Sequence, residues 1–580
     1  MTSPTASAFN LPNHLIAKGQ PALIAADELH FAAIAASLDQ SIANLSHRLG
    51  TERKAPGGSG QRALDRDLEI HRLTSRLRAL RRYGVDLCLG HIVGADNPEP
   101  VYVGRLGLTD SAGRRLLLDW RSPAAEPFFA ATHGCPMGLA RRRRYRWTGG
   151  RVSDYWDEVF STDRLAGMEG HPALDDQSAF LASLAGTRST RMRDVLGTIQ
   201  ADQDAIIRAT SRGALVVDGG PGTGKTVVAL HRCAYLLYSD PRLGSRGGSA
   251  RSTNSGGVLF VGPHQPYLNY VADVLPSLGE DSVQLCTLHD LVAEGPAAAI
   301  EPDPDVALLK SSAELVRAIE TAVRFYEEPP TKGMSVATYW SDLWLAAEDW
   351  AEAFDAAEPG TPHNEARDQV WLELVTILMA KHEPEGSAPL LRTSLLQNEE
   401  LLTAFNRAWP LIDAADLVAD LWSVPAYLRS CAPWLSSAEV RALQRADAQA
   451  WTVSDLPLLD AARHRLGDPG SARRKRRQEA TVAARRKQLS RVVEDLIAAD
   501  DSELLLMTSL RQQDLQDALV DEDTLAAADP DLLAGPFAHI VVDEAQELTD
   551  AEWQMMLLRC PSRSFTIVGD RAQARRGFPE

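Results

Sequence analysis

Residues 214–232 read ALVVDGGPGTGKTVVALHR, and this stretch decides the fold around it. The apolar run Ala214–Val217 favours a buried strand, and the residues from Lys225 onward favour a helix because they contain neither Gly nor Pro. Between them, Gly219 to Thr226 matches G-x-x-x-x-G-K-[ST], a pattern that requires this strand–loop–helix context. The sequence therefore predicts a phosphate-binding loop in an α/β domain.

The residue types of this loop suit a nucleoside triphosphate with Mg²⁺. Glycines allow the backbone to wrap phosphates, and N–H groups at the helix N-terminus supply positive potential. Lys225 is expected to neutralise the β- and γ-phosphates, and the Thr226 hydroxyl to bind Mg²⁺. The nucleotide-binding residues predicted here are Gly219, Gly220, Pro221, Gly222, Thr223, Gly224, Lys225 and Thr226.

Two later apolar runs also end in polar residues. HIVVDEAQ, residues 539–546, places two carboxylates at the carboxyl end of a strand, where open α/β sheets bind ligands. We expect Asp543 to hold Mg²⁺, through water, and Glu544 to polarise the attacking water. After the run SFTIVGD, Gln573 could sense the γ-phosphate, although that loop is weak evidence when taken alone.

The N-terminal region has the periodicity of two helices. Apolar residues recur at three- and four-residue steps between Asp27 and Leu49, and again between Ile70 and Leu80. The Gly-rich segment 55–60 separates the two stripes, which predicts an antiparallel helical hairpin. This hairpin could either fold onto a core or project as an arm.

Residues Val101 to Phe160 alternate apolar and polar positions between turn residues, which predicts a small antiparallel β unit. It contains four consecutive arginines, Arg141 to Arg144, beside a tyrosine and a tryptophan. The arginines could contact phosphate, or they could form a solvated strand face over buried aromatic rings.

Strands alternate with helices again from about Met192 to Asp290, which predicts a parallel sheet. From Val292 to Pro530 the sequence favours helices and shows no strand pattern, so the strands of residues 539–569 return to the earlier sheet. Within this helical region, Ser471 to Lys487 forms a dense basic helix, either a solvated face or a contact for nucleic acid or an acidic partner.

These patterns divide the chain into five segments. We expect an N-terminal helical arm at residues 1–90, a small β-rich unit at 91–165, the first part of the parallel-sheet lobe at 166–290, a helical insertion at 291–535, and the return of the lobe at 536–580.

Composition narrows the class of protein. Of 580 residues, 44% are hydrophobic and 24% charged, as in ordinary globular proteins. No run approaches the ~18 uninterrupted apolar residues that span a bilayer, so no membrane association is expected. The six cysteines are scattered without metal spacing, which favours free thiols and a cytoplasmic location. The net charge of −18 argues against a protein whose whole surface binds nucleic acid, but it permits local basic grooves.

GGPGTGKT, VVDEAQ and VGDRAQA, in that order, resemble motifs I, II and III of superfamily 1 helicases of the UvrD/Rep kind. IQADQ resembles their Q motif, which implies that Gln203 reads adenine, with Gln200 as the alternative. VGPHQPYLNYV and TLHDL occupy the places of motifs Ia and Ic.

More specifically, the chain resembles the HelD-like (HelR-type) ATPases that bind and recycle bacterial RNA polymerase. The resemblance extends from about Asp27 to the last residue. The stretches that carry it are YVGRLGLTD, LLLDWRSPAAEPFFAAT, RRRRY, RMRDVLGTIQADQDAIIR, GGPGTGKTVVALHRCAYLLY and WTVSDLPLLDAA.

The resemblance implies an α/β fold: a P-loop RecA-like parallel-sheet lobe with a large helical insertion, preceded by the helical hairpin and the β unit. It implies ATP and Mg²⁺ as cofactors, Thr226 and Asp543 as metal ligands, and Lys225 and Glu544 as catalytic residues. It also implies that the arm enters the secondary channel of RNA polymerase and that the insertion reaches the main channel, where it competes with nucleic acid. Negative charge suits such channels, which are positively charged.

The leading hypothesis is thus an ATP-binding, helicase-like ATPase that associates with RNA polymerase and displaces or recycles it from nucleic acid. The family has a second RecA-like lobe after motif III, whereas this sequence ends at Glu580. An arginine supplied across the cleft is typically worth ~10³–10⁵ in rate, so we expect slow or absent hydrolysis. We do not expect Arg575 and Arg576 to substitute for it. The alternatives are an ATP-dependent 3′–5′ DNA helicase of the UvrD/Rep type and a non-catalytic protein that binds RNA polymerase.

Overall fold

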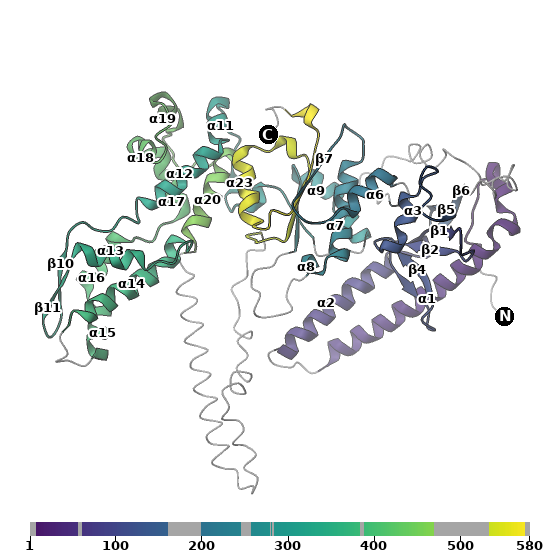
Figure 1. Ribbon diagram of the computed structural model, residues 1–580, viewed down its shortest axis with the longest axis horizontal. Helices are drawn as coiled ribbons and strands as arrows, with labels where there is room; N and C mark the ends of the chain where they lie inside the picture. The colour runs from purple at the N-terminus through teal and green to yellow at the C-terminus, as the bar shows by residue number, and fades with distance from the viewer. Residues whose placement is uncertain are drawn as a thin grey trace, which may run out of the picture. The chain divides into compact units, whose positions relative to one another are not determined.

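The computed structural model describes residues 7–55, 61–160, 196, 199–244, 257–278, 280, 283–382, 388–468 and 533–574. The chain is α/β and divides into two compact units (Figure 1). The first comprises residues 1–287, 534–547 and 559–580, and the second comprises 288–533 and 548–558. The basic segment Ser471–Lys487 and the pair Arg575 and Arg576 lie outside the described residues.

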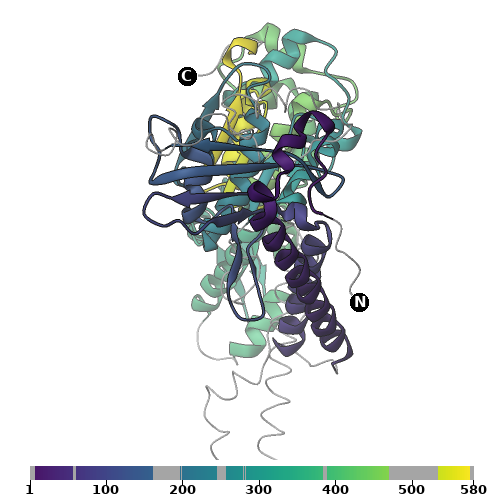
Figure 2. The same cartoon turned by 90° about the vertical axis from the view of Figure 1, so that its right-hand side faces the viewer.

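The first unit begins with two long helices, α1 (Pro21–Lys54) and α2 (Gln61–Arg81), which lie side by side (Figure 2). Near its start, α1 buries Phe31 and Ile34 against the six-stranded sheet described below. Farther along, Leu49 of α1 packs with Leu73 and Leu77 of α2 in a small cluster of its own. The pair therefore combines both arrangements that the sequence left open, since one half packs on a sheet and the other half is held by contacts between the helices.

By length and composition, α1 could also cross a membrane, contrary to the expectation from the sequence. In its most apolar 18-residue stretch, 33% is buried inside the structure. Two polar side chains of α1 bond to the neighbouring β unit. Asp27 pairs with Arg143 at 2.8 Å, and the Ser37 hydroxyl donates to the carbonyl of Thr109 at 2.8 Å. Because buried polar groups of α1 find partners in this unit, we interpret α1 as a helix packed onto the sheet.

The N-terminal sheet has six strands in the order β3-β4-β2-β1-β5-β6. The predicted purely antiparallel arrangement is wrong in one respect, because β2 pairs with β4 in parallel. After β2 the chain forms the short β3–β4 hairpin, whose second strand lies beside β2 in the same direction. The strands are β1 (Cys88–Gly94), β2 (Val101–Gly104), β3 (Leu108–Thr109), β4 (Arg115–Asp119), β5 (Leu139–Thr148) and β6 (Arg151–Val159).

The arginine run lies on β5, and three of its four members are buried. Arg143 donates to Asp157 at 2.6 and 2.7 Å and to Asp27 at 2.8 Å. On the other face, Arg142 donates to the carbonyl of Phe128 at 2.9 Å. Arg141 is half-buried. A phosphate contact or a solvated face is therefore wrong for Arg142, Arg143 and Arg144, which belong to the interior of the unit.

The second sheet of this unit has five parallel strands in the order β7-β13-β12-β8-β9. Strands from residues 214–286 and 539–569 thus form one sheet. The three-residue strand β9 has no counterpart in the sequence analysis because it is too short to show a pattern. The strands are β7 (Ala214–Asp218), β8 (Val258–Val261), β9 (Gln284–Cys286), β12 (His539–Val542) and β13 (Phe565–Gly569).

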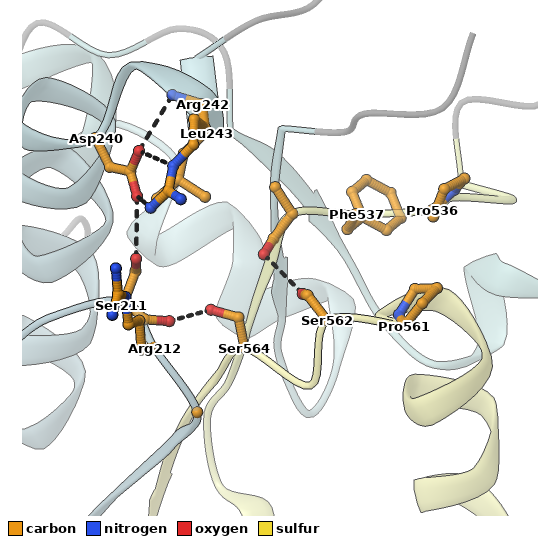
Figure 3. A pocket seen from close by; sticks show the side chains of 12 residues that line it. Ser211, Arg212, Asp240, Arg242, Leu243, Pro536, Phe537, Pro561, Ser562 and Ser564 are labelled. Atoms are coloured by element: carbon orange, nitrogen blue, oxygen red, sulfur yellow. Dashed lines mark hydrogen bonds and ion pairs between the residues drawn. The ribbon is translucent and has the colours of Figure 1, made fainter. Parts of the chain in front are cut away.

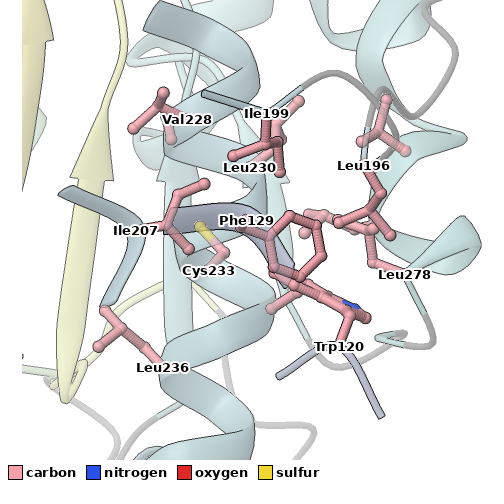
Figure 4. Packing of buried hydrophobic residues seen from close by; sticks show 14 of the residues in the cluster. Trp120, Phe129, Leu196, Ile199, Ile207, Val228, Leu230, Cys233, Leu236 and Leu278 are labelled. Atoms are coloured by element: carbon pink, nitrogen blue, oxygen red, sulfur yellow. The ribbon is translucent and has the colours of Figure 1, made fainter. Parts of the chain in front are cut away.

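A shared hydrophobic core joins the two sheets of the first unit (Figure 4). Trp120 and Phe129 of the N-terminal part pack with Leu230 and Cys233 of helix α7. Arg121, next in the DWRSP stretch, pairs with Asp119 at 2.9 Å and with Glu280. This stretch therefore positions the N-terminal sheet against the parallel sheet. The helices of this part are α3 (Glu126–Ala130), α6 (Ala201–Arg208), α7 (Lys225–Ser239), α8 (Pro241–Gly244), α9 (Gln265–Val271) and α10 (Val274–Ser277).

The buried His539 should make the first unit sensitive to acid. Its ring nitrogens contact the hydroxyls of Ser564 at 2.7 Å and Thr566 at 2.9 Å. Burial, with the nearby charge of Arg232, lowers the pKa of His539 to about 3. The usual pKa of histidine is about 6.5, so below that pH the unfolded chain binds a proton that the folded chain does not. The free energy of unfolding therefore decreases as the pH is lowered. From pH 7.5 to 5.0 this group should remove about 2 kcal/mol of unfolding free energy.

His539→Gln should therefore lose about 2 kcal/mol less than the wild type over the same pH interval. Chemical denaturation of both proteins at both pH values measures this difference. Hydrogen exchange of the amides in β12 and β13 then shows whether the loss is located around His539. Equal losses in the two proteins would contradict it.

The second unit is mainly helical. The sequence shows no strand pattern there, and the prediction of helices alone is wrong in one place, because β10 (Met334–Ala337) and β11 (Asp342–Leu345) form an antiparallel hairpin. Each strand is only four residues long, with alternating burial, so its pattern is hard to distinguish from a loop. The helices are α11 (Pro304–Lys310), α12 (Ala313–Arg324), α13 (Ala347–Asp355), α14 (His363–Ala380), α15 (Ala388–Leu396), α16 (Glu399–Ala408), α17 (Ala414–Ser423), α18 (Pro425–Cys431), α19 (Ser437–Leu443), α20 (Leu456–Leu466) and α23 (Asp550–Arg559).

The WTVSDLPLLDAA stretch organises a buried ion-pair network in this unit. Asp455 is fully buried and pairs with Lys310 at 2.9 Å and with Arg445 at 2.9 Å. Glu301 also pairs with Lys310, at 2.7 Å. Burial by itself would raise the pKa of Asp455, but the charges of Lys310 and Arg445, together with hydrogen bonds to the carboxylate, lower it. The aspartate of this stretch thus stabilises the helical unit from inside.

Candidate nucleotide-binding site

The loop between β7 and α7 lies at the carboxyl edge of the parallel sheet. Gly222 and Gly224 have φ values of 75° and 85°, in the left-handed region that favours glycine. A Cβ atom built on Gly220 or Gly222 meets no atom within 4 Å, so the loop is open on one side. Such a glycine-rich turn into a helix can direct backbone N–H groups toward a phosphate.

Lys225 is half-buried and lies across this loop. Its Nζ donates to the carbonyl oxygens of Gly219 and of Gly220, the latter at 2.9 Å. The hydroxyl of Thr223 donates to the same Gly220 carbonyl at 2.9 Å. The amine therefore lies close to the space that the loop surrounds.

Gln203 contacts the loop from α6. Its Nε2 donates to the carbonyl of Thr223 at 3.1 Å, and its Oε1 accepts from the backbone N–H of Gln200 at 3.1 Å. A Cβ on Gly224 would lie 3.0 Å from the Gln203 amide nitrogen, which is a second reason for glycine there. Of the two glutamines considered for reading adenine, Gln203 touches the loop and Gln200 precedes the helix.

Thr226 and Asp543 are 317 positions apart in the sequence but form a hydrogen bond. The Thr226 hydroxyl donates to Oδ2 of Asp543 at 2.7 Å. The Asp543 side chain is buried, and this burial raises its pKa against the effect of its hydrogen-bond donors. Parallel strands bring their carboxyl ends to one edge, which is how the residue after β12 reaches the helix after β7.

The oxygen atoms of Thr226 and Asp543 suit Mg²⁺, which prefers oxygen ligands and keeps several waters or phosphate oxygens. Among the described residues, no group of three or more His, Cys, Asp or Glu side chains could hold a metal. A magnesium ion at this place would thus take its remaining ligands from phosphate and water, as is usual for Mg²⁺ beside a nucleotide.

Glu544 follows Asp543 in a left-handed conformation, with φ of 55°. Such a conformation in a residue other than glycine costs of order 1–3 kcal/mol and is found mainly at functional sites. Its Oε2 accepts from Nε2 of Gln546 at 2.6 Å, and the Oε1 of Gln546 accepts from the N–H of Asp570 at 3.0 Å. Gln573 donates to Asp570 at 2.6 Å. Gln573 is thus connected to Glu544 through the carboxylate and backbone N–H of Asp570 and the side chain of Gln546.

Sequence reasoning missed three residues at this edge: Tyr267, Gln546 and Asp570. The hydroxyl of Tyr267, on α9, donates to Oδ2 of Asp543. Tyr267 follows β8, the direct neighbour of β12, so a prediction of strand order could have placed it near Asp543. Side-chain bridges such as that of Gln546 leave no periodic signal in a sequence.

A separate pocket of about 560 Å³ lies at the amino ends of β7, β12 and β13, and Figure 3 shows the residues around it. At its rim, Asp240 pairs with Arg242 at 2.7 Å and accepts from Ser211 at 3.1 Å. Ligands of parallel sheets bind at the carboxyl edge, so this pocket is distinct from the candidate site.

Residues 24–172 match a family model described as DNA helicase IV HelD, N-terminal domain. No curated protein matches the chain. The matched segment contains most of α1, all of α2 and the six-stranded sheet. The match indicates that residues 24–172 of this chain form a domain similar to the N-terminal domain of HelD.

Proposed function

We propose that this protein is a P-loop ATPase of helicase superfamily 1 that binds ATP and Mg²⁺ at loop 219–226 and Asp543. The observation that carries the proposal is the 2.7 Å hydrogen bond between Thr226 and Asp543, beside the half-buried amine of Lys225. A RecA-like lobe would bring together these groups, a hydroxyl, a carboxylate and a cation, at the carboxyl edge of its sheet.

Each residue has a role in this proposal. Lys225 would exchange the loop carbonyls for phosphate oxygens, and Gln203 would read the base. Thr226 and Asp543 would hold a magnesium ion, which would neutralise charge on the β- and γ-phosphates. Glu544 accepts a proton from the attacking water, and Gln546 and Asp570 connect it to Gln573.

We further propose RNA polymerase as the partner, which the protein would displace or recycle from nucleic acid. The match of residues 24–172 to the HelD N-terminal domain supports this, as does the net charge of −18. Negatively charged surfaces can occupy channels whose positive charge holds phosphate backbones. The helical pair α1–α2 would enter one channel, and the helical unit would compete with nucleic acid in another.

The family description includes the words DNA helicase, which favours a second candidate, an ATP-dependent 3′–5′ DNA helicase. Stimulation of ATP turnover distinguishes the two. We expect bacterial RNA polymerase core enzyme to bind the protein and to raise its slow turnover more than a saturating oligo(dT) strand does. Stimulation by the DNA strand alone would favour the helicase. Polymerase binding without nucleotide binding would indicate a non-catalytic binding protein.

A further inference from the structure

Tyr267 contacts the candidate magnesium site but has no role in the mechanism above. Its hydroxyl donates to Oδ2 of Asp543 and lies 3.4 Å from the hydroxyl of Thr226. The other oxygen of the carboxylate, Oδ1, accepts from the backbone N–H of Glu544 at 2.9 Å. Both oxygens of Asp543 are therefore oriented, and Tyr267 is the one donor from α9.

The tyrosine ring is itself held in place. A Cβ on Gly262 would lie 2.9 Å from the ring of Tyr267, so only glycine allows this close packing against the end of β8. The ring of His264 lies edge-on to Tyr267 and accepts from its backbone N–H at 3.1 Å. Leu268 and Val271 anchor α9 in the core. The position of the hydroxyl is thus fixed before any ligand arrives.

We propose that Tyr267 is a positioning residue that holds the Asp543 carboxylate in the orientation needed to bind Mg²⁺. The inference rests on the proposed function and adds to it a residue that acts on the metal through another side chain. Partners that orient a metal ligand typically change metal affinity 10–100-fold when they are removed. Without the hydroxyl, Asp543 keeps two donors instead of three and can rotate away from Thr226.

The test compares full-length wild type with Tyr267→Phe, which keeps the ring and removes the hydroxyl. Binding of a fluorescent ATP analogue is measured in EDTA and then across a Mg²⁺ titration. We expect the two proteins to have equal affinity in EDTA. We also expect the variant to need about 10-fold more Mg²⁺, or more, to reach its high-affinity state.

Tyr270→Phe is the matched control, since Tyr270 lies on the same helix but is exposed. It should leave the Mg²⁺ requirement unchanged. Tyr267→Leu should reproduce the effect of Tyr267→Phe, because both variants lack the hydroxyl. Either variant suffices for the test if its melting temperature equals that of the wild type.

The outcomes separate this inference from the proposed function. If the wild type does not bind the analogue, the proposed function fails and there is no metal for Tyr267 to position. If the wild type binds but the variants share its Mg²⁺ requirement, or lose affinity equally in EDTA, Tyr267 packs the helix and the inference is overturned. A lower Mg²⁺ requirement in the variants would overturn it too, because the hydroxyl would then compete with the metal.

Discussion

Lys225→Ala is expected to weaken ATP binding about 100-fold or more without unfolding the protein. A charge-assisted hydrogen bond contributes about 1.5–3 kcal/mol, and 1.4 kcal/mol corresponds to a factor of ten. Loss of two such contacts to phosphate therefore accounts for at least a 100-fold change. The fold should tolerate the change because the carbonyls of Gly219 and Gly220 that the amine now contacts are only half-buried.

Isothermal titration with ATP and Mg²⁺ measures this loss. Lys54→Ala is the control, because Lys54 is an exposed lysine at the end of α1, and it should bind ATP like the wild type. If Lys225→Ala bound ATP as tightly as the control, the loop after β7 would not be where the triphosphate is held. Polymerase capture by both variants would also show whether docking depends on the nucleotide.

Arg143→Ala should destabilise the N-terminal part of the first unit by about 3–5 kcal/mol, the usual cost of removing one partner from a buried ion pair. Arg143 lies between Asp27 and Asp157, and the three side chains are at most 3% exposed. The two carboxylates raise the pKa of Arg143, against the effect of burial. Without the guanidinium, α1 and β6 would each retain a buried carboxylate that has lost its cation.

Hydrogen exchange of the amides in β5 and β6 measures this effect in the full chain, because it reports the local opening free energy. Arg141→Ala is the matched control: it lies two positions earlier on the same strand face, its side chain is 31% exposed, and it is 3.9 Å from Asp157. We expect it to cost less than about 1 kcal/mol, as partly exposed ion pairs do. Similar losses in the two variants would show that Arg143 does not hold the carboxylates together.

The strands that show a clear pattern could be predicted from the sequence. The apolar runs at Ala214, Val258, His539 and Phe565 begin β7, β8, β12 and β13. The prediction that the first of these strands is buried is wrong, because β7 lies at the edge of the described sheet and buries only Val217. The carboxyl-edge rule then predicts that the residues after these strands lie together. That reasoning needs only the apolar pattern of each strand and the direction of the chain, and both can be read from a single sequence.

Other features depend on partners distant in the chain, which no periodic pattern reveals. The arginines of β5 look like a solvated face until Asp27 of α1, 116 positions away, is placed beside Arg143. Likewise, the position of Tyr267 depends on the order of β8 and β12 in the sheet. The hairpin of β10 and β11 and the strand β9 are too short to be distinguished from turns.

The strand order of the parallel sheet also constrains how the protein is made. β12 lies between β8 and β13, so the sheet cannot close until residues 539–569 have left the ribosome. At 5–20 residues per second, synthesis from Val261 to His539 takes roughly 15 to 55 seconds. During that time β7 lacks its partner β13, and β8 lacks its partner β12. Such unpaired strand edges favour aggregation. Nascent chains stalled before β12 should therefore be those that chaperones hold longest.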